Sequence, residues 1–148
     1  MNLPGYQKAL GSAIDNKVCN VGYPGYNLNP DYAKGIDILA DLYVKTFGLE
    51  PTSVFSVINY MGTMALWDVI KRSGSMDSEK LVQAAIKTDI SGDDTLLRYG
   101  IKFSPPGSPN MGQNMLARYF VTQWQNGKLV IVDPAKAASP GKHLVITE

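Results

Sequence analysis

The chain has 148 residues, 45% hydrophobic and 18% charged, which suits one domain with a proper core and is too short for two ordinary domains. Its formal net charge is +1, from 14 basic and 13 acidic residues, so charge gives no reason to expect nucleic acid as a partner. No stretch approaches the roughly 18 uninterrupted apolar residues of a membrane helix, and residues 1–6 show no signal peptide.

The chain begins with a short predicted helix, over residues 6–16, followed by a brief buried strand over residues 17–21. Residues 22–30 then supply two glycines, two prolines and two asparagines. This composition is typical of a loop, and we interpret the segment as a crossing between two domains.

Two long helices are predicted next. Asn29 can cap the first helix and Pro30 suits its first turn, while Gly48 is placed to end it. The second helix opens at residue 52 or 53 and runs to residue 73. Because it is apolar almost all round, we expect it to be buried, with Asn59 as a polar exception that must either form hydrogen bonds or face a cleft.

The segment after residue 74 is predicted to hold a third helix and a strand. Asp77 is the expected cap of that helix, whose buried edge runs over residues 81–86. Residues 96–103 read as a strand, and residues 104–112 as a rigid, irregular loop.

The chain ends with a predicted β-hairpin. Residues 119–124 are aromatic and β-branched, and residues 129–132 are aliphatic. Between them, Asn126 and Gly127 suit a type I′ turn because both residues accept positive φ. Pro134 closes the second strand, since proline cannot donate to a ladder. Helices and strands together indicate the α/β class.

Signatures of catalysis and metal binding are missing from the sequence. Cys19 is the sole cysteine and is expected to be a small buried hydrophobe, while His143, the sole histidine, is expected at the surface. Asp89, Asp93 and Asp94 cluster, but their spacing does not match a calcium loop, and a solvated turn is the ordinary interpretation. We therefore expect no enzyme activity, no metal and no cofactor.

Aromatic and amide side chains favour binding of a small molecule instead. They lie in loops or near helix starts, where aromatic rings can line a pocket and an amide can orient a polar ligand. An ordinary role in the core is the alternative for each of them. The residues are Tyr23, Tyr26, Phe55, Asn59 and Tyr60.

Several of these segments, in this order, resemble one family. Gly-Gln-Asn at residues 112–114, the strand ending in Gln-Trp, Asn-Gly-Lys, the aliphatic strand and Asp-Pro look like the C-terminal end of type I periplasmic solute-binding proteins, the leucine/isoleucine/valine-binding family of ATP-driven importers. The helix ending in Phe47-Gly48 with Pro51 after it, and the exit Lys71-Arg72-Ser73-Gly74, are similar to segments of the same family. One departure is Met61, where the family usually has aspartate.

The resemblance implies the periplasmic-binding-protein-like I fold, a two-lobed, three-layer α/β sandwich, of which this chain is an incomplete C-terminal fragment. Residues 1–24 would end the second lobe, residues 25–117 would form the C-terminal part of the first lobe, and residues 118–148 would return as a hairpin to the second lobe. Family members are more than twice this length, so we expect the fragment alone to bind nothing tightly.

The function implied by the resemblance is capture of amino acids or small amides for an ABC importer, by hinge closure outside the cytoplasm, with a membrane permease as partner. The family's pocket aromatic carries over to Phe55, with Asn59, Tyr60 and Tyr23 as further ligand-binding residues. The alternative is a cytoplasmic or surface ligand sensor on the same fold.

Overall fold

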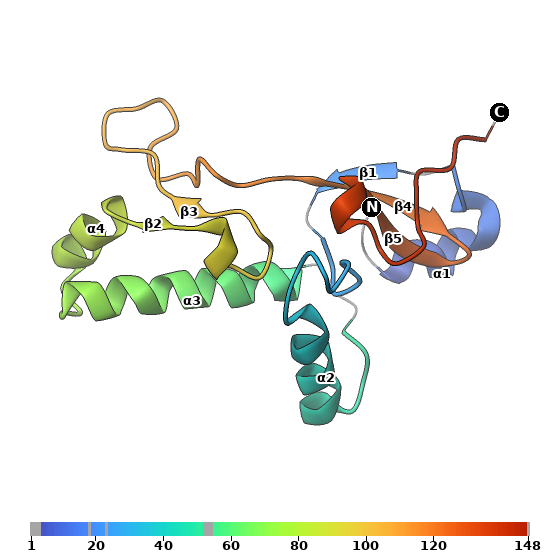
Figure 1. Ribbon diagram of the computed structural model, residues 1–148, viewed down its shortest axis with the longest axis horizontal. Coiled ribbons are helices and arrows are strands. Elements are labelled where there is room, and N and C mark those ends of the chain that lie inside the picture. Colours follow the sequence, from blue (N-terminus) through green and yellow to red (C-terminus); the bar gives the residue numbers. More distant parts are fainter. Residues whose placement is uncertain (1–3, 18, 23, 52–54, 148) are drawn as a thin grey trace. The chain divides into compact units, whose positions relative to one another are not determined.

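The computed structural model describes residues 4–17, 19–22, 24–51 and 55–147. Its helices and strands are shown in Figure 1. The helices are α1 (Pro4–Leu10), α2 (Ile36–Phe47), α3 (Phe55–Ser73) and α4 (Ser78–Ile86), with short 3₁₀ turns at Gly11–Ile14, Gly92–Asp94 and Ala135–Ala137. The strands are β1 (Cys19–Gly22), β2 (Asp89–Ile90), β3 (Ile101–Lys102), β4 (Phe120–Gln125) and β5 (Lys128–Asp133).

The chain divides into two compact units. Unit 1 comprises Met1–Ile58 and Tyr119–Glu148, and unit 2 comprises Asn59–Arg118. In the described part of the chain, no helix combines the length and hydropathy that crossing a bilayer requires.

Unit 1 contains a three-stranded antiparallel sheet in the order β1-β4-β5. The predicted hairpin is confirmed: β4 and β5 pair up to Gln125 and Lys128, and the two turn residues, Asn126 and Gly127, have φ of 52° and 72°. Positive φ at both positions is what a type I′ turn requires. The sheet buries Phe120, Trp124 and Ile131.

The predictions for the first helix and the first strand of unit 1 are wrong in part. The predicted helix 6–16 is α1 followed by a 3₁₀ turn. Strand β1 begins two residues later than expected and is not buried, since Val21 is 66% exposed and Cys19 is also exposed. The strand lies at the edge of its sheet, where an apolar sequence alone does not produce burial.

Helix α2 ends as predicted, at Gly48 in the left-handed region with φ of 69°, but it starts at Ile36 rather than near Pro30. The Asn29 side-chain oxygen accepts a hydrogen bond from the Asp31 amide at 3.0 Å, which closes a local turn instead of capping a helix. Gly35, with φ of 92°, then separates this turn from the helix.

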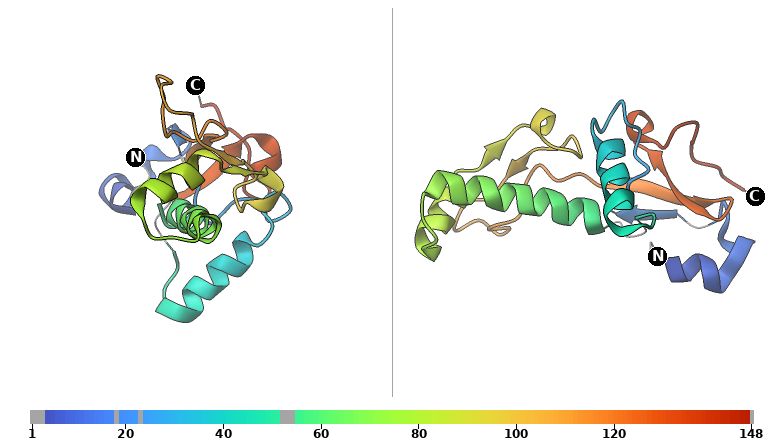
Figure 2. Two further views of the ribbon diagram at one scale, coloured as in Figure 1. Left: turned by 90° about the vertical axis from the view of Figure 1, so that its left-hand side faces the viewer. Right: turned by 90° about the horizontal axis from the view of Figure 1, so that it is seen from below.

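Unit 2 is built on α3, and Figure 1 and the right-hand view of Figure 2 show β2 and β3 running alongside it. Its core is made of residues from α3, α4 and the β2–β3 region: Met61, Ala65, Val69, Ala84, Leu97, Tyr99 and Ile101. The predicted burial of α3 on all sides is wrong, because Met64, Leu66 and Trp67 are more than half exposed. The proposed start of this helix at residue 52 or 53 lies outside the described residues.

The cap of α4 is confirmed, since the Asp77 carboxylate accepts a hydrogen bond from the Lys80 amide at 3.1 Å. The predicted strand 96–103 is wrong: only Ile101–Lys102 is a strand, paired with β2, which the sequence reading missed. The Thr95 hydroxyl donates to the Tyr99 carbonyl at 2.7 Å and Arg98 has φ of 57°, so residues 95–99 form a turn.

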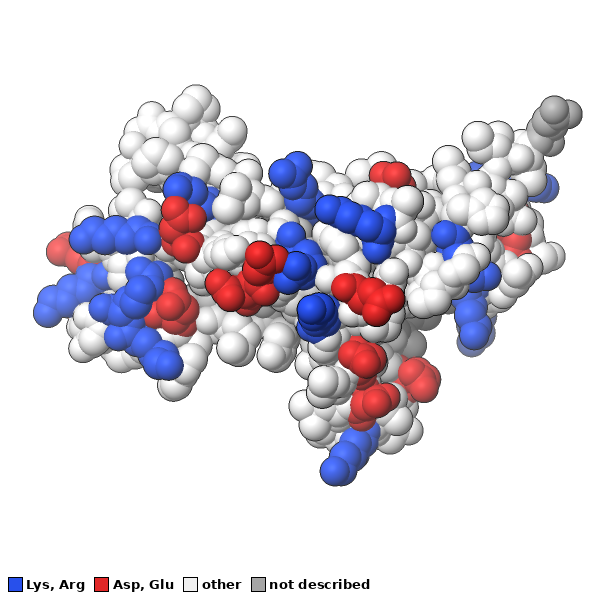
Figure 3. Space-filling model, in the orientation of Figure 1, with Lys and Arg blue, Asp and Glu red and all other residues white. Residues whose placement is uncertain are grey.

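Charges of both signs lie next to one another on the face shown in Figure 3. In unit 2, Asp93 pairs with Arg98 at 2.5 Å and Asp89 pairs with Lys102 at 2.6 Å. Within the described ranges, no three His, Cys, Asp or Glu side chains converge in a way that could hold a metal ion.

Candidate functional site

The first turn of α3 carries the residue for which a ligand contact is predicted, Phe55, whose side chain is 51% exposed. The next residue, Ser56, forms a side-chain hydrogen bond with Tyr26, a residue of the loop before α2. This bond ties the first turn of α3 to a distant part of unit 1 and fixes the position from which Phe55 projects.

An aromatic cluster supports the same turn. The ring centroids of Tyr26 and Tyr43 lie 6.0 Å apart, and those of Tyr43 and Phe47 lie 4.7 Å apart, which are separations typical of aromatic pairs. Burial raises the pKa of Tyr26 above its ordinary value of 10.0, the bond to Ser56 opposes that rise, and the charge of Tyr43 adds to it.

Helix geometry decides which of the predicted site residues share a face. Asn59 follows Phe55 by four residues, so the two side chains lie on one side of α3. Tyr60 follows Phe55 by five residues and lies about 140° around the axis. Asn59 and Tyr60 are both exposed. Tyr23 lies outside the described residues.

An exposed phenyl ring with an amide one turn away offers two kinds of contact. Phe55 provides an apolar surface for a ligand side chain, and Asn59 provides both a donor and an acceptor. Neither group is a nucleophile or a general acid at neutral pH. The arrangement is therefore suited to holding a small molecule rather than to transforming it.

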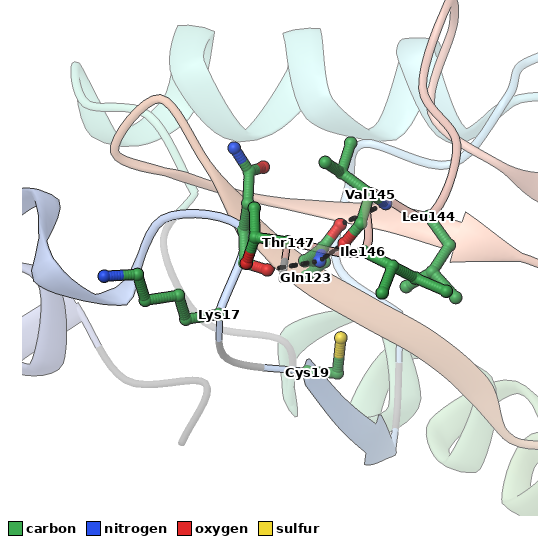
Figure 4. A pocket seen from close by; sticks show the side chains of 8 residues that line it. Lys17, Cys19, Gln123, Leu144, Val145, Ile146 and Thr147 are labelled. Carbon is green, nitrogen blue, oxygen red and sulfur yellow. Dashed lines mark hydrogen bonds between the residues drawn. The ribbon is translucent and has the colours of Figure 1, made fainter.

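A concavity lies in unit 1, beside the sheet. It has a volume of about 430 Å³ and is shown in Figure 4. Its lining comes from the segment before β1, from β4 and from the C-terminal segment: Asn16, Lys17, Cys19, Gln123, Leu144, Val145, Ile146 and Thr147.

The buried side chain of Gln123 holds this concavity together. Its amide nitrogen donates to the carbonyls of Asn16 at 3.1 Å and Val145 at 2.6 Å, and its amide oxygen accepts from the Val145 amide at 3.0 Å. Gln125 adds a bond from its amide nitrogen to the His143 carbonyl at 2.7 Å. Two glutamine side chains thus pair with the extended C-terminal segment as a neighbouring strand would.

The sequence reading missed the role of these glutamines. The available signal was two amides spaced two residues apart, hence on one face of a strand that is otherwise apolar and aromatic. Buried amides need partners, so the pattern indicates a polar attachment point, although it does not identify the partner.

The chain matches proteins named for binding of branched-chain amino acids. It is 32% identical over 130 residues to Leu/Ile/Val-binding protein homolog 8 of Brucella abortus, a match that covers 88% of this chain and 31% of that protein. The chain is a relative of the Leu/Ile/Val-binding proteins. Homolog 7 of the same organism is 29% identical over an equal span. No family model matches the chain.

The predicted fold is confirmed by a solved structure. The leucine-binding protein LivK of Thermotoga maritima superposes with a TM-score of 0.63 at 19% identity, over 93% of this chain and 35% of that one. At this identity the likeness establishes the type I periplasmic-binding-protein fold. The chain spans about a third of the length of these relatives, so it corresponds to part of that fold.

Proposed function

We propose that this chain is part of a solute-binding protein that captures amino acids or small amides outside the cytoplasm and delivers them to an ABC importer. The observation that carries the proposal is the match to Leu/Ile/Val-binding proteins over 88% of the chain. The names of those relatives describe binding, which also favours capture over catalysis.

Phe55 and Asn59 are the proposed contacts with the ligand. The phenyl ring, 51% exposed at the start of α3, packs against the ligand's side chain. The Asn59 amide, on the same face of the helix, orients a polar group of the ligand. Tyr60 and Tyr23 are proposed as neighbours of this site.

Capture would work by hinge closure. In this proposal residues 1–24 and 118–148 belong to one lobe and residues 25–117 to the other. A ligand that contacts both lobes favours the closed state by the free energy of the contacts made only there, and the membrane permease then recognises that closed state. The isolated chain supplies only part of the contacts, so we expect it to bind ligand poorly.

The test uses a completed chain, defined as the Brucella abortus homolog 8 with this chain in place of the matched region. Calorimetric titration with leucine, isoleucine, valine and small amides measures the dissociation constants. We expect binding by the completed chain, and a weakening of about tenfold or more in Phe55→Ala, because truncating a central aromatic anchor removes its packing.

Leu66→Ala is the matched control, since Leu66 is 55% exposed on the same helix and takes no part in the proposed contact. Equal affinities of the Phe55→Ala and Leu66→Ala chains would contradict the role of Phe55. If no amino acid or amide binds the completed chain, the proposed function fails. Fractionation of cells that express the native protein tests location, because recovery in the cytoplasm would favour a sensor on the same fold.

A further inference from the structure

One face of α3 in unit 2 is only half covered. Met61, Ala65 and Val69 recur every four residues and are at most 7% exposed. Beside them, a second row of large apolar side chains remains 43–58% exposed. This row, called here the α3 stripe, consists of Tyr60, Met64 and Trp67.

The α3 stripe continues the buried face instead of opposing it. Met64 follows buried Met61 by three residues, and at about 100° per residue the middle of the stripe lies roughly 130° from the middle of the buried row. The two rows therefore lie beside each other on the helix, with Asp68 between them. Asn59, Thr63 and Leu66 lie on the other side of the helix.

A surface helix usually buries the whole of such a face. Scattered exposed hydrophobic residues are common, but a contiguous row of tyrosine, methionine and tryptophan beside a core marks a place where another part of a protein packs. In unit 2 the first row is buried and the second is left exposed.

The lengths of the relatives indicate which polypeptide covers the α3 stripe. This chain matches 31% of the Brucella abortus homolog 8 and 35% of LivK, and α3 lies within a superposition that spans 93% of the chain. About two thirds of the fold is therefore polypeptide that the chain does not match. We propose that the α3 stripe is the surface on which that remaining part of the fold packs.

The proposal also separates the aromatic residues of α3 by role. Tyr60, proposed above as a neighbour of the ligand, is assigned by this proposal to the packing face instead, whereas Phe55 and Asn59 lie on a different side of the helix. It does not depend on what the protein binds: an uncovered stripe can be filled whether or not the site at Phe55 holds a ligand.

The first experiment compares the solvent access of Trp67 in this chain and in the completed chain. Trp124 is 5% exposed, so in the isolated chain acrylamide should quench mainly the 58% exposed Trp67. In the completed chain we expect that quenching to fall at least threefold and the emission to shift to shorter wavelength. Trp67→Phe identifies the contribution of Trp67. A folded completed chain in which Trp67 stays as accessible as before would overturn the proposal.

The second experiment uses two matched variants in trans. This chain is mixed with the residues of the Brucella abortus homolog 8 that lie outside the matched region, and complex formation is followed by size-exclusion chromatography and sedimentation. Met64→Asp places a charge in the stripe, while Leu66→Asp places the same charge at a site of similar exposure, 55% against 52%, on another face.

We expect Met64→Asp to weaken the complex at least tenfold and Leu66→Asp to change it less than threefold. Equal effects of the two variants would overturn the proposal. So would self-association of this chain that Met64→Asp abolishes, because a second copy would then cover the stripe. If the pieces do not associate in trans and Trp67 is unprotected in the completed chain, the stripe is not a packing surface. Protection of Trp67 without ligand binding would refute the proposed function alone.

Discussion

The β4–β5 hairpin and helix α3 are both rich in apolar residues, but they bury them differently. Five of the six residues of β4 are buried, whereas the described core of unit 2 takes one α3 residue per turn. Hydrogen bonds within unit 1 hold the hairpin in place. Gln123 donates to the Val145 carbonyl, Asp15 accepts from the Gly127 amide, and Ser139 accepts from the Ile131 amide. The hairpin thus finds its partners within unit 1, whereas Tyr60, Met64 and Trp67 of α3 stay exposed among the described residues.

The largest expected effect removes the central attachment of the hairpin. Gln123→Ala deletes the side chain of a residue that is 1% exposed and leaves part-buried backbone groups of Asn16 and Val145 without this partner. We expect a loss of about 2–4 kcal/mol in the free energy of unfolding of unit 1. Urea denaturation followed by circular dichroism measures it.

Gln113→Ala is the control for this substitution, because Gln113 is an exposed glutamine whose backbone, not side chain, forms the hydrogen bond to Ser104. Its stability should stay within about 0.5 kcal/mol of the wild type. If both variants unfold at the same urea concentration, the hairpin does not depend on its amide attachments.

The next effect concerns the C-terminal end of α3, where Arg72 forms several hydrogen bonds. The Arg72 guanidinium donates to the Asp68 carboxylate at 2.8 Å, the Ala84 carbonyl at 2.7 Å and the Thr88 hydroxyl at 2.7 Å. Its side chain is 35% exposed, so solvent screening limits the ion pair. We expect Arg72→Ala to destabilise unit 2 by about 1–2 kcal/mol.

Arg72→Lys should recover only a small part of this loss, because an ammonium group cannot reproduce the planar fork. Hydrogen exchange of the α4 amides reports the effect locally, and Lys71→Ala at the neighbouring exposed position is the control. Full protection of α4 in Arg72→Ala would show that apolar contacts alone hold this helix.

Replacing one glycine in the hairpin and one in α3 should change the stability in opposite directions. Gly127 in the hairpin turn has φ of 72°, where alanine is strained, so Gly127→Ala should destabilise by about 1 kcal/mol or more. Gly62 in α3 has open space around it, and Gly62→Ala should stabilise by about 0.5–1 kcal/mol through better helix propensity. Thermal unfolding measures both. Destabilisation by Gly62→Ala would indicate that α3 already has a close neighbour on that side.

The sequence predicted best what adjacent residues determine. The turn at Asn126 and Gly127 and the ends of α2 and α4 at Gly48 and Asp77 depend on local backbone chemistry, and each is confirmed. The strand predicted over residues 96–103 failed because a side-chain bond from Thr95 turned the backbone.

The candidate site was less predictable, because it depends on contacts that are remote in sequence. The pattern located Phe55 near the start of a helix, but not the Tyr26–Ser56 bond that holds this turn. Gln123 was missed since its partner, Val145, lies 22 residues away in the sequence. The predicted ligand contacts of Phe55, Asn59, Tyr60 and Tyr23 remain predictions.

The smallest effect is a pKa change where the loop before α2 meets the first turn of α3. Burial raises the pKa of Tyr26 and the Ser56 bond opposes that rise, so Ser56→Ala should raise the pKa further. Because the folded-state pKa lies above the unfolded value of 10.0, the stability linked to Tyr26 is present below pH 10 and is lost as pH rises through the folded pKa. Titration of ¹³C-labelled tyrosine by NMR resolves this residue, which Tyr26→Phe assigns. An unchanged or lower pKa in Ser56→Ala would mean that the serine does not stabilise the phenolate, and that aromatic packing alone positions the turn that carries Phe55.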